Sequence, residues 1–315
     1  MRKSVIIHNY KKIILVFVFI SLSIMGENTD SILAQSLYSH VQFLSNTPGY
    51  RNHLNIHSLN IAAGYIDSVF SMFSHRVEIQ SFTVDSLSYQ NIICSFGPEA
   101  GERIIVGAHY DVCYFQSGAD DNASGVAGLL ELARLLSENT TELERRIDLV
   151  AYSLEEPPNF KRESMGSYVH AKSLYDSKVD IKLMISLDMI GYFDENPNTQ
   201  HFPIGLMKLF YPDKANFIAV ISNYQNYFSG VKVKRLLSKN SSIKVCQFSG
   251  PSILEGIDFS DHLNFWKFGY DAVFISDTAF YRNQNYHKKT DTIETLNFEL
   301  LSELVKGIHL TIKQL

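Results

Sequence analysis

The sequence has few cysteines, no CxxC pair and no surplus of positive charge. Three Cys among 315 residues are too few for a disulfide scaffold, and the lack of a CxxC pair argues against a structural zinc knot. Lys and Arg number 28 against 33 Asp and Glu, a formal net charge of −5. That balance argues against a protein that binds nucleic acid through a basic surface.

Internal repeats and linkers rich in Pro, Gly or Ser are also absent. What is present is 45% hydrophobic and 12% aromatic residues with only 19% charged residues. Disordered chains have low hydrophobicity and high net charge, so this composition predicts a folded globular protein. The length allows a substantial buried core.

The N-terminal segment differs from the rest of the chain. Residues 1–12 carry four cations and no acid, and residues 13–25 form an uncharged apolar run. A basic segment followed by an apolar run of this length is typical of a secretory signal, and it is short for a membrane span of about 20 residues. We therefore expect a signal peptide over residues 1–26, a single domain over residues 27–315, and export to the periplasm or the medium without stable membrane association. A membrane anchor by the uncleaved segment stays open, because no small-x-small cleavage site is evident.

Apolar periodicity predicts alternating helices and strands. Helices are expected over residues 31–44, 55–73, 124–136, 165–175, 213–237, 258–268 and 297–312, and strands over 77–84, 88–95, 102–108, 147–153, 182–187 and 272–276. Such alternation predicts an α/β domain with a mixed, mainly parallel sheet.

Acidic and histidine side chains come at or just after the ends of three of these strands. His109 follows the first, Glu155 and Glu156 the second, and Asp188 the third. Functional residues in such sheets gather beyond the carboxyl ends of the strands. These four side chains are therefore expected at one edge of the sheet.

Two loops would add further groups to that edge. Asp120 lies in a loop that leads into the helix at 124–136, and His287 lies in a polar loop after the last strand. Singly, each residue has an ordinary structural explanation, such as a helix N-cap for Asp120. Jointly, converging carboxylates would repel one another without a cation, and a set of histidines and carboxylates suits a catalytic zinc site.

Six motifs in order carry a specific resemblance. GAHYD, GADDNASG, EEPP, LDMIGY, SDHLNF and YHKKTDT resemble the co-catalytic di-zinc aminopeptidases, from about Leu33 to the C-terminus. The superfamily includes glutamate carboxypeptidases, transferrin-receptor ectodomains and glutaminyl cyclases. The resemblance implies a three-layer αβα sandwich around a mixed, mostly parallel sheet.

The resemblance also implies roles for single residues and two zinc ions per chain. Asp120 would bridge the ions, and the peptide bond between Asp120 and Asp121 would be cis. The remaining ligands would be His109 and Asp188 on one ion, and Glu156 and His287 on the other.

The implied reaction is removal of N-terminal residues from a peptide substrate by a secreted exopeptidase. A hydroxide bridging the metals would attack, and Glu155 would act as the general base. Asp111 would accept a hydrogen bond from the ring of His109, and Tyr281 would donate one to the oxyanion.

Three other functions stay open at this point. A glutaminyl-peptide cyclotransferase would use nearly the same ligands with one zinc, although DDNASG and Tyr286 favour a peptidase. A carboxypeptidase or dipeptidase would need a basic pocket, for which Arg162 and Arg282 are candidates. An inactive binding domain is disfavoured, because all the implied ligands and Glu155 are present.

Several smaller points complete the expectations. EEPPNF departs from the bacterial leucyl aminopeptidase motif, in which a Gly-containing turn follows, so the substrate pocket need not resemble that of those enzymes. Asp261 is expected in the polar network behind the metals, and His262 is expected to be structural. Cys94 and Cys246 would be free to pair after export. The sequence gives neither the oligomeric state nor the preferred substrate residue.

Overall fold

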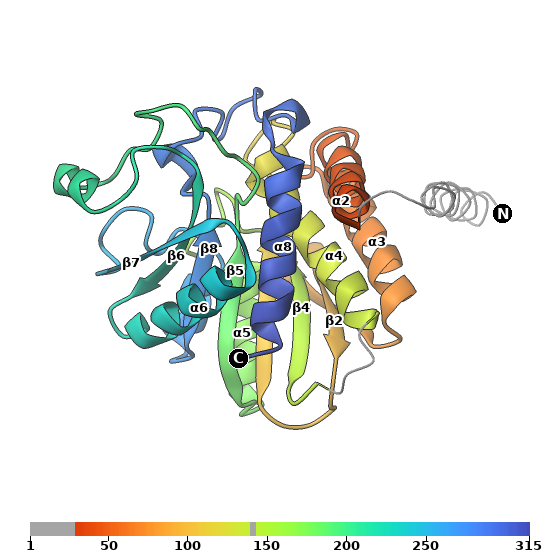
Figure 1. Cartoon of the computed structure of the whole chain (residues 1–315). Coiled ribbons are helices and arrows are strands. Elements are labelled where there is room, and N and C mark those ends of the chain that lie inside the picture. Colours follow the sequence, from red (N-terminus) through yellow and green to blue (C-terminus); the bar gives the residue numbers. More distant parts are fainter. Residues whose placement is uncertain (1–28, 139–142) are drawn as a thin grey trace.

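An eight-stranded sheet organises the molecule, in the order β1-β2-β4-β3-β5-β8-β6-β7. The computed structural model in Figure 1 describes residues 29–138 and 143–315, so the predicted signal peptide lies outside the described residues. The strands are β1 (Val77–Val84), β2 (Leu87–Phe96), β3 (Arg103–His109), β4 (Arg146–Tyr152), β5 (Ile181–Leu187), β6 (Phe217–Asn223), β7 (Lys244–Gly250) and β8 (Ala272–Ser276).

The pairing of the strands is mixed, as the sequence predicted. β4, β3, β5 and β8 are parallel neighbours, and β6 pairs with β7 in parallel. β1–β2, β2–β4 and β6–β8 are antiparallel. The four consecutive parallel strands all end at the same edge of the sheet.

Helices cover both faces of the sheet. The helices are α2 (Thr29–Ser45), α3 (Ile56–Phe73), α4 (Gly125–Ser137), α5 (Gly166–Asp176), α6 (Tyr227–Asn240), α7 (His262–Lys267) and α8 (Phe298–Ile312). The main core packs α2, α3, α4, α6 and α8 on one face, and a second core packs α5 and α7 on the other. Figure 1 shows α4 and α8 in front of the sheet and α5 behind it. The three-layer αβα sandwich is confirmed.

Local sequence explains the elements that enclose the site. β3 is almost wholly apolar, and all but its first residue are buried, as expected for a strand covered on both faces. α4 is apolar nearly all round and most of its residues are buried, which suits a helix enclosed between the sheet and other helices. α3 begins where the side chain of Asn55 accepts a hydrogen bond from the Ser58 amide at 3.2 Å, an ordinary N-cap.

The sequence prediction differs from the structure at three places in the C-terminal half. Residues 213–237 were expected to be one helix, but they contain the whole of β6 followed by most of α6. β6 is a short, fully buried apolar run, and periodicity alone does not separate such a run from a buried helix. The strand β7 was missed, and α7 begins at His262 instead of residue 258.

None of the helices in residues 29–138 and 143–315 is long and apolar enough to cross a membrane.

The three cysteines are buried free thiols, so the pairing left open for Cys94 and Cys246 is not formed.

Candidate metal centre

The carboxyl ends of three neighbouring parallel strands bring the expected side chains together. His109 is the last residue of β3, Glu155 and Glu156 lie in the turn after β4, and Asp188 follows β5. His109 Nε2 is 3.4 Å from Asp188 Oδ1 and 4.0 Å from Glu155 Oε2. The grouping expected from the strand ends is therefore confirmed.

Asp121, and not Asp120, contributes the aspartate between the two histidines. Asp121 Oδ1 lies 3.5 Å from His109 Nε2, and Asp121 Oδ2 lies 3.2 Å from His287 Nε2. Each oxygen of this carboxylate thus faces a different histidine. The placement of Asp120 at this position is wrong by one residue.

Asp120 has its carboxylate engaged elsewhere. Its Oδ1 accepts a hydrogen bond from the Gly191 amide at 2.9 Å, and its Oδ2 accepts one from Asn283 Nδ2 at 2.7 Å. The two aspartates lie in a short irregular turn, Ala119–Ser124, in which the backbone of Asp121 is non-helical. The cis peptide bond is likewise displaced by one residue, between Asp121 and Asn122.

Two buried side chains that sequence reasoning missed hold this turn. Asp291 accepts hydrogen bonds from the backbone amides of Asp120 and Asp121, at 2.9 and 3.1 Å. Arg51 donates to the carbonyl oxygens of Ser117 and Gly118, both at 2.6 Å. Asp291 lies in the YHKKTDT motif, which offered a signal for it. Arg51 lies outside all six motifs.

The second half of the centre surrounds His287. Its Nε2 is 3.2 Å from Glu156 Oε2, and its ring stacks on Tyr286 with centroids 3.8 Å apart. The thiol of Cys113 lies on the same side, because the donor atoms of Cys113, Glu156 and His287 fall within 4.8 Å of one another.

Asp111 lies beside His109, but its hydrogen bonds go mainly to the backbone. Asp111 Oδ1 is 3.6 Å from His109 Nδ1, which is too long for the predicted hydrogen bond. The two carboxylate oxygens instead accept hydrogen bonds from the amides of Glu155 and Glu156, both at 3.1 Å. Asp111 thus fixes the turn that carries both glutamates.

Burial and mutual repulsion shift the pKa values of the acids at the centre, so that added positive charge would stabilise their ionised forms. Burial, together with neighbouring carboxylates, raises the pKa of Glu155 well above its ordinary value and that of Glu156 to about 7. Burial also opposes ionisation of Asp121, yet the flanking histidines lower the pKa of Asp121 below its ordinary value. Burial disfavours the His109 cation, but Asp188 and the other acids raise the pKa of His109. The histidines and the buried guanidinium of Arg51, which interacts with Asp121 and Glu156, are fewer than the acids that they must offset.

The donor atoms fit metal ions. Asp121 Oδ2 and Glu156 Oε1 are buried and accept no hydrogen bond, although buried carboxylate oxygens normally find a donor. His109, Asp121 and Asp188 form one potential ligand group, and His287 and Glu156 face the other Asp121 oxygen. Imidazole and carboxylate groups in this arrangement suit zinc at an open, catalytic site.

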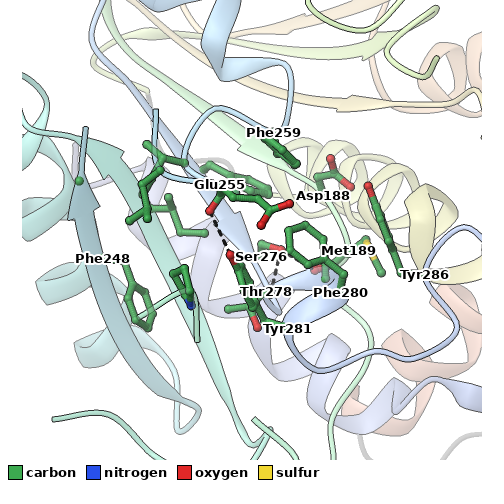
Figure 2. A pocket seen from close by; sticks show the side chains of 18 of the residues that line it. Asp188, Met189, Phe248, Glu255, Phe259, Ser276, Thr278, Phe280, Tyr281 and Tyr286 are labelled. Atoms are coloured by element: carbon green, nitrogen blue, oxygen red, sulfur yellow. Dashed lines mark hydrogen bonds between the residues drawn. The ribbon is translucent and has the colours of Figure 1, made fainter. Parts of the chain in front are cut away.

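A cavity of about 650 Å³ opens from the centre. Figure 2 shows Asp188 and Tyr286 at one end of it and Phe248 at the other. Most of the remaining wall is apolar, with Phe160, Phe202, Ile204, Leu254, Phe259 and Phe280 among the lining residues. A cavity of this size and character suits an organic ligand with an apolar group.

Tyr281 lines the same cavity. Its hydroxyl donates a hydrogen bond to the Glu255 carbonyl oxygen at 3.3 Å, a dashed line in Figure 2. Burial raises the pKa of Tyr281 to about 12, so the hydroxyl keeps its proton. To stabilise an oxyanion, the hydroxyl would have to break its hydrogen bond to Glu255 and donate one to the substrate instead.

The remaining candidate residues from the sequence lie outside the proposed ligand set. His262 Nε2 bonds the Ile257 carbonyl oxygen at 2.7 Å, which confirms it as a structural histidine. Asp261 is buried, and burial raises its pKa to about 7. The guanidinium of Arg282 is buried against the Gln200 side chain and the Phe217 carbonyl oxygen, whereas Arg162 is exposed. Neither arginine lines the cavity.

Curated relatives of this chain include peptidases. The chain is 43% identical over 282 residues to an uncharacterized protein, YfbL, of Escherichia coli (strain K12), covering 87% of this chain and 86% of YfbL. It is 25% identical over 239 residues to leucine aminopeptidase 1 of Coccidioides posadasii, covering 71% of this chain and only 55% of that protein.

Solved structures share the fold at low sequence identity. The LapA aminopeptidase of Legionella pneumophila aligns with a TM-score of 0.70 at 18% identity, covering 89% of this chain and 71% of LapA. The glutaminyl cyclase of Porphyromonas gingivalis aligns with a TM-score of 0.67 at 21% identity, covering 89% and 98%. The family model described as "Peptidase family M28" matches residues 91–312, a range that holds every residue of the centre. The chain belongs to peptidase family M28.

Proposed function

We propose that this chain is a zinc-dependent aminopeptidase that hydrolyses the N-terminal peptide bond of its substrate. The observation that carries the proposal is the position of Asp121, whose two carboxylate oxygens each face a separate histidine. That geometry suits two metal ions sharing one carboxylate. One ion would be held by His109 and Asp188, and the other by Glu156 and His287.

Different side chains would bind the metal ions, transfer the proton and position the general base. Zinc, when bound, would supply a Lewis acid for the scissile carbonyl and a water of lowered pKa. Glu155 is the carboxylate left over after both ligand groups are filled, and it lies on the His109 side. It would take the proton of the attacking water and deliver it to the leaving amine. Asp111 holds Glu155 in position through the backbone.

The charge of the cavity favours an amino terminus over a carboxyl terminus. Among the described residues that line it, none is Lys or Arg, whereas Asp121, Glu155, Glu156 and Asp188 lie at its end. A substrate ammonium group would be attracted there, and a substrate carboxylate would find no Lys or Arg to pair with. This contrast supports an aminopeptidase over a carboxypeptidase.

A glutaminyl-peptide cyclotransferase is the second candidate. The fold resemblance to the Porphyromonas gingivalis glutaminyl cyclase favours it. The two-sided contact of Asp121 with His109 and His287 supports the two-metal peptidase instead, since a cyclase is expected to need only one metal.

The first prediction contrasts the two adjacent aspartates. Asp121→Asn should weaken zinc binding by about 100-fold or more, because it removes a charged oxygen from a position shared by both ions. Asp120→Asn, the matched control, should still bind two zinc ions with lower stability, because the carboxylate of Asp120 is engaged by Gly191 and Asn283. Zinc content after dialysis against a weak chelator measures both. Loss of zinc in Asp120→Asn with retention in Asp121→Asn would contradict the proposed ligand set.

The second prediction concerns the general base. Glu155→Gln should keep two zinc ions and lose about 10²–10⁴-fold in kcat, whereas Glu99→Gln, at an exposed glutamate, should leave both unchanged. A strong chelator should abolish the activity of the wild-type protein, and zinc should restore it. A Glu155→Gln variant as active as the wild type would remove Glu155 from the mechanism.

The third prediction separates the candidate reactions and the substrate class. A peptide with N-terminal Leu or Phe should release the free amino acid, with kcat/KM at least about tenfold above that for N-terminal Ala, because the cavity wall buries the larger apolar group. N-terminal acetylation should stop cleavage. Ammonia and a pyroglutamyl product from an N-terminal Gln peptide, without release of Leu from the Leu peptide, would establish the cyclotransferase instead.

We also propose that the protein is exported, with the basic and apolar segment at residues 1–26 removed. Mass spectrometry of the protein from cell fractions measures the mature N-terminus. A start near residue 27 in the periplasm or the medium is expected, and an intact Met1 in the membrane fraction would show an uncleaved anchor.

A further inference from the structure

Cys113 lies at the second half of the metal centre. It stands four residues after His109, in the loop between β3 and the Ala119–Ser124 turn. Its sulfur and the donor atoms of Glu156 and His287 fall within 4.8 Å of one another. The thiol therefore faces the same space as the two side chains proposed to hold the second ion.

The backbone on both sides keeps the thiol in place. The Val112 amide donates a hydrogen bond to the Arg51 carbonyl oxygen at 3.0 Å, and the Tyr114 carbonyl oxygen accepts one from Asn52. Tyr114 and Phe115 are each 56% exposed, whereas Cys113 is only 2% exposed. Tyr114 and Phe115 thus point into solvent, whereas the thiol of Cys113 is directed at the centre.

A second observation indicates that a ligand belongs beside the thiol. Glu156 Oε1 is buried and accepts no hydrogen bond. Asp121 Oδ2 is also buried and also accepts no hydrogen bond. Both carboxylates lie at the half of the centre that Cys113 faces. Anionic oxygens that accept no hydrogen bond, beside a sulfur and an imidazole, form a mixed donor set that is suited to zinc.

We propose that Cys113 Sγ is a direct ligand of the metal ion held by Asp121, Glu156 and His287. The inference rests on the proposed function, because it assigns a further ligand to the same centre. On binding, the S–H bond breaks, a sulfur–metal bond forms and the proton passes to solvent. Zinc–ligand bonds of about 2.0–2.3 Å put tetrahedral donor atoms about 3.3–3.7 Å apart. From separations of at most 4.8 Å, the donor atoms of Cys113, Glu156 and His287 would therefore have to approach one another by about 1.5 Å at most.

A sulfur ligand makes the two halves of the centre chemically different. The half at His109 and Asp188 offers nitrogen and oxygen only, whereas the half at Cys113 adds a soft thiolate. Soft ligands favour softer ions, so the second half should bind cadmium and zinc in preference to harder ions. The other two cysteines do not share this position, because Cys94 lies within β2 and Cys246 within β7.

Cobalt substitution tests the assignment by a readout other than activity. Wild-type protein loaded with two Co²⁺ ions should show a thiolate-to-cobalt charge-transfer band in the near ultraviolet, which nitrogen and oxygen ligands do not produce. Cys113→Ser should lose the band and bind the second ion about 100-fold more weakly. Cys246→Ser, the matched control, should keep the band and both ions. A band that persists in Cys113→Ser, or is missing from the wild type, overturns the proposal.

A second measurement needs no variant, which covers the case in which Cys113→Ser fails to fold. X-ray absorption at the zinc edge of the wild-type holoenzyme should show sulfur at about 2.3 Å from zinc. Only nitrogen and oxygen neighbours in a protein that holds two zinc ions and cleaves peptides would leave the proposed function standing and remove Cys113 from the ligands. A protein that binds no zinc or cobalt would overturn both.

Discussion

Repulsion among buried carboxylates is the constraint on which the centre depends. Asp121, Glu155, Glu156 and Asp188 meet at one edge of the sheet, and all four are nearly excluded from solvent. The histidines His109 and His287 supply positive charge within the group, and the buried guanidinium of Arg51 adds to it from nearby. Such a cluster is expensive to bury unless its charge is compensated. Binding of metal ions is therefore expected to stabilise the fold as well as to provide the chemistry, because ions that bind only the native state shift the folding equilibrium toward it.

Parallel strands and two fixed turns bring these acids together at one place. Parallel pairing of β4, β3 and β5 brings their carboxyl ends together, and Asp111 fixes the turn after β4 through two backbone amides. Asp291 does the same for the turn that carries Asp121. In both turns a carboxylate that is not a proposed ligand orders the backbone of one that is. The opposite end of the cavity is apolar, so hydrolysis and selection of the substrate are assigned to separate groups of residues.

Much of this arrangement could be predicted from the sequence, because buried strands are continuous apolar runs and the polar residue after each strand marks the site. The strand ends at His109 and Asp188 were located in this way. The choice between Asp120 and Asp121 could not be made, because the direction of each side chain depends on backbone torsions in an irregular turn. Arg51 and Cys113 were not assigned roles either, since their positions depend on contacts between segments remote in sequence. β6 was mistaken for helix because a fully buried strand has no periodicity.

The central claim is that Asp121 is shared by two metal ions. A crystal structure of the zinc-loaded protein, with anomalous scattering recorded at the zinc edge, tests this most directly. The account predicts two anomalous peaks, one between Asp121 and His109 and the other between Asp121 and His287. A single peak, or peaks that contact Asp120 in place of Asp121, would contradict it.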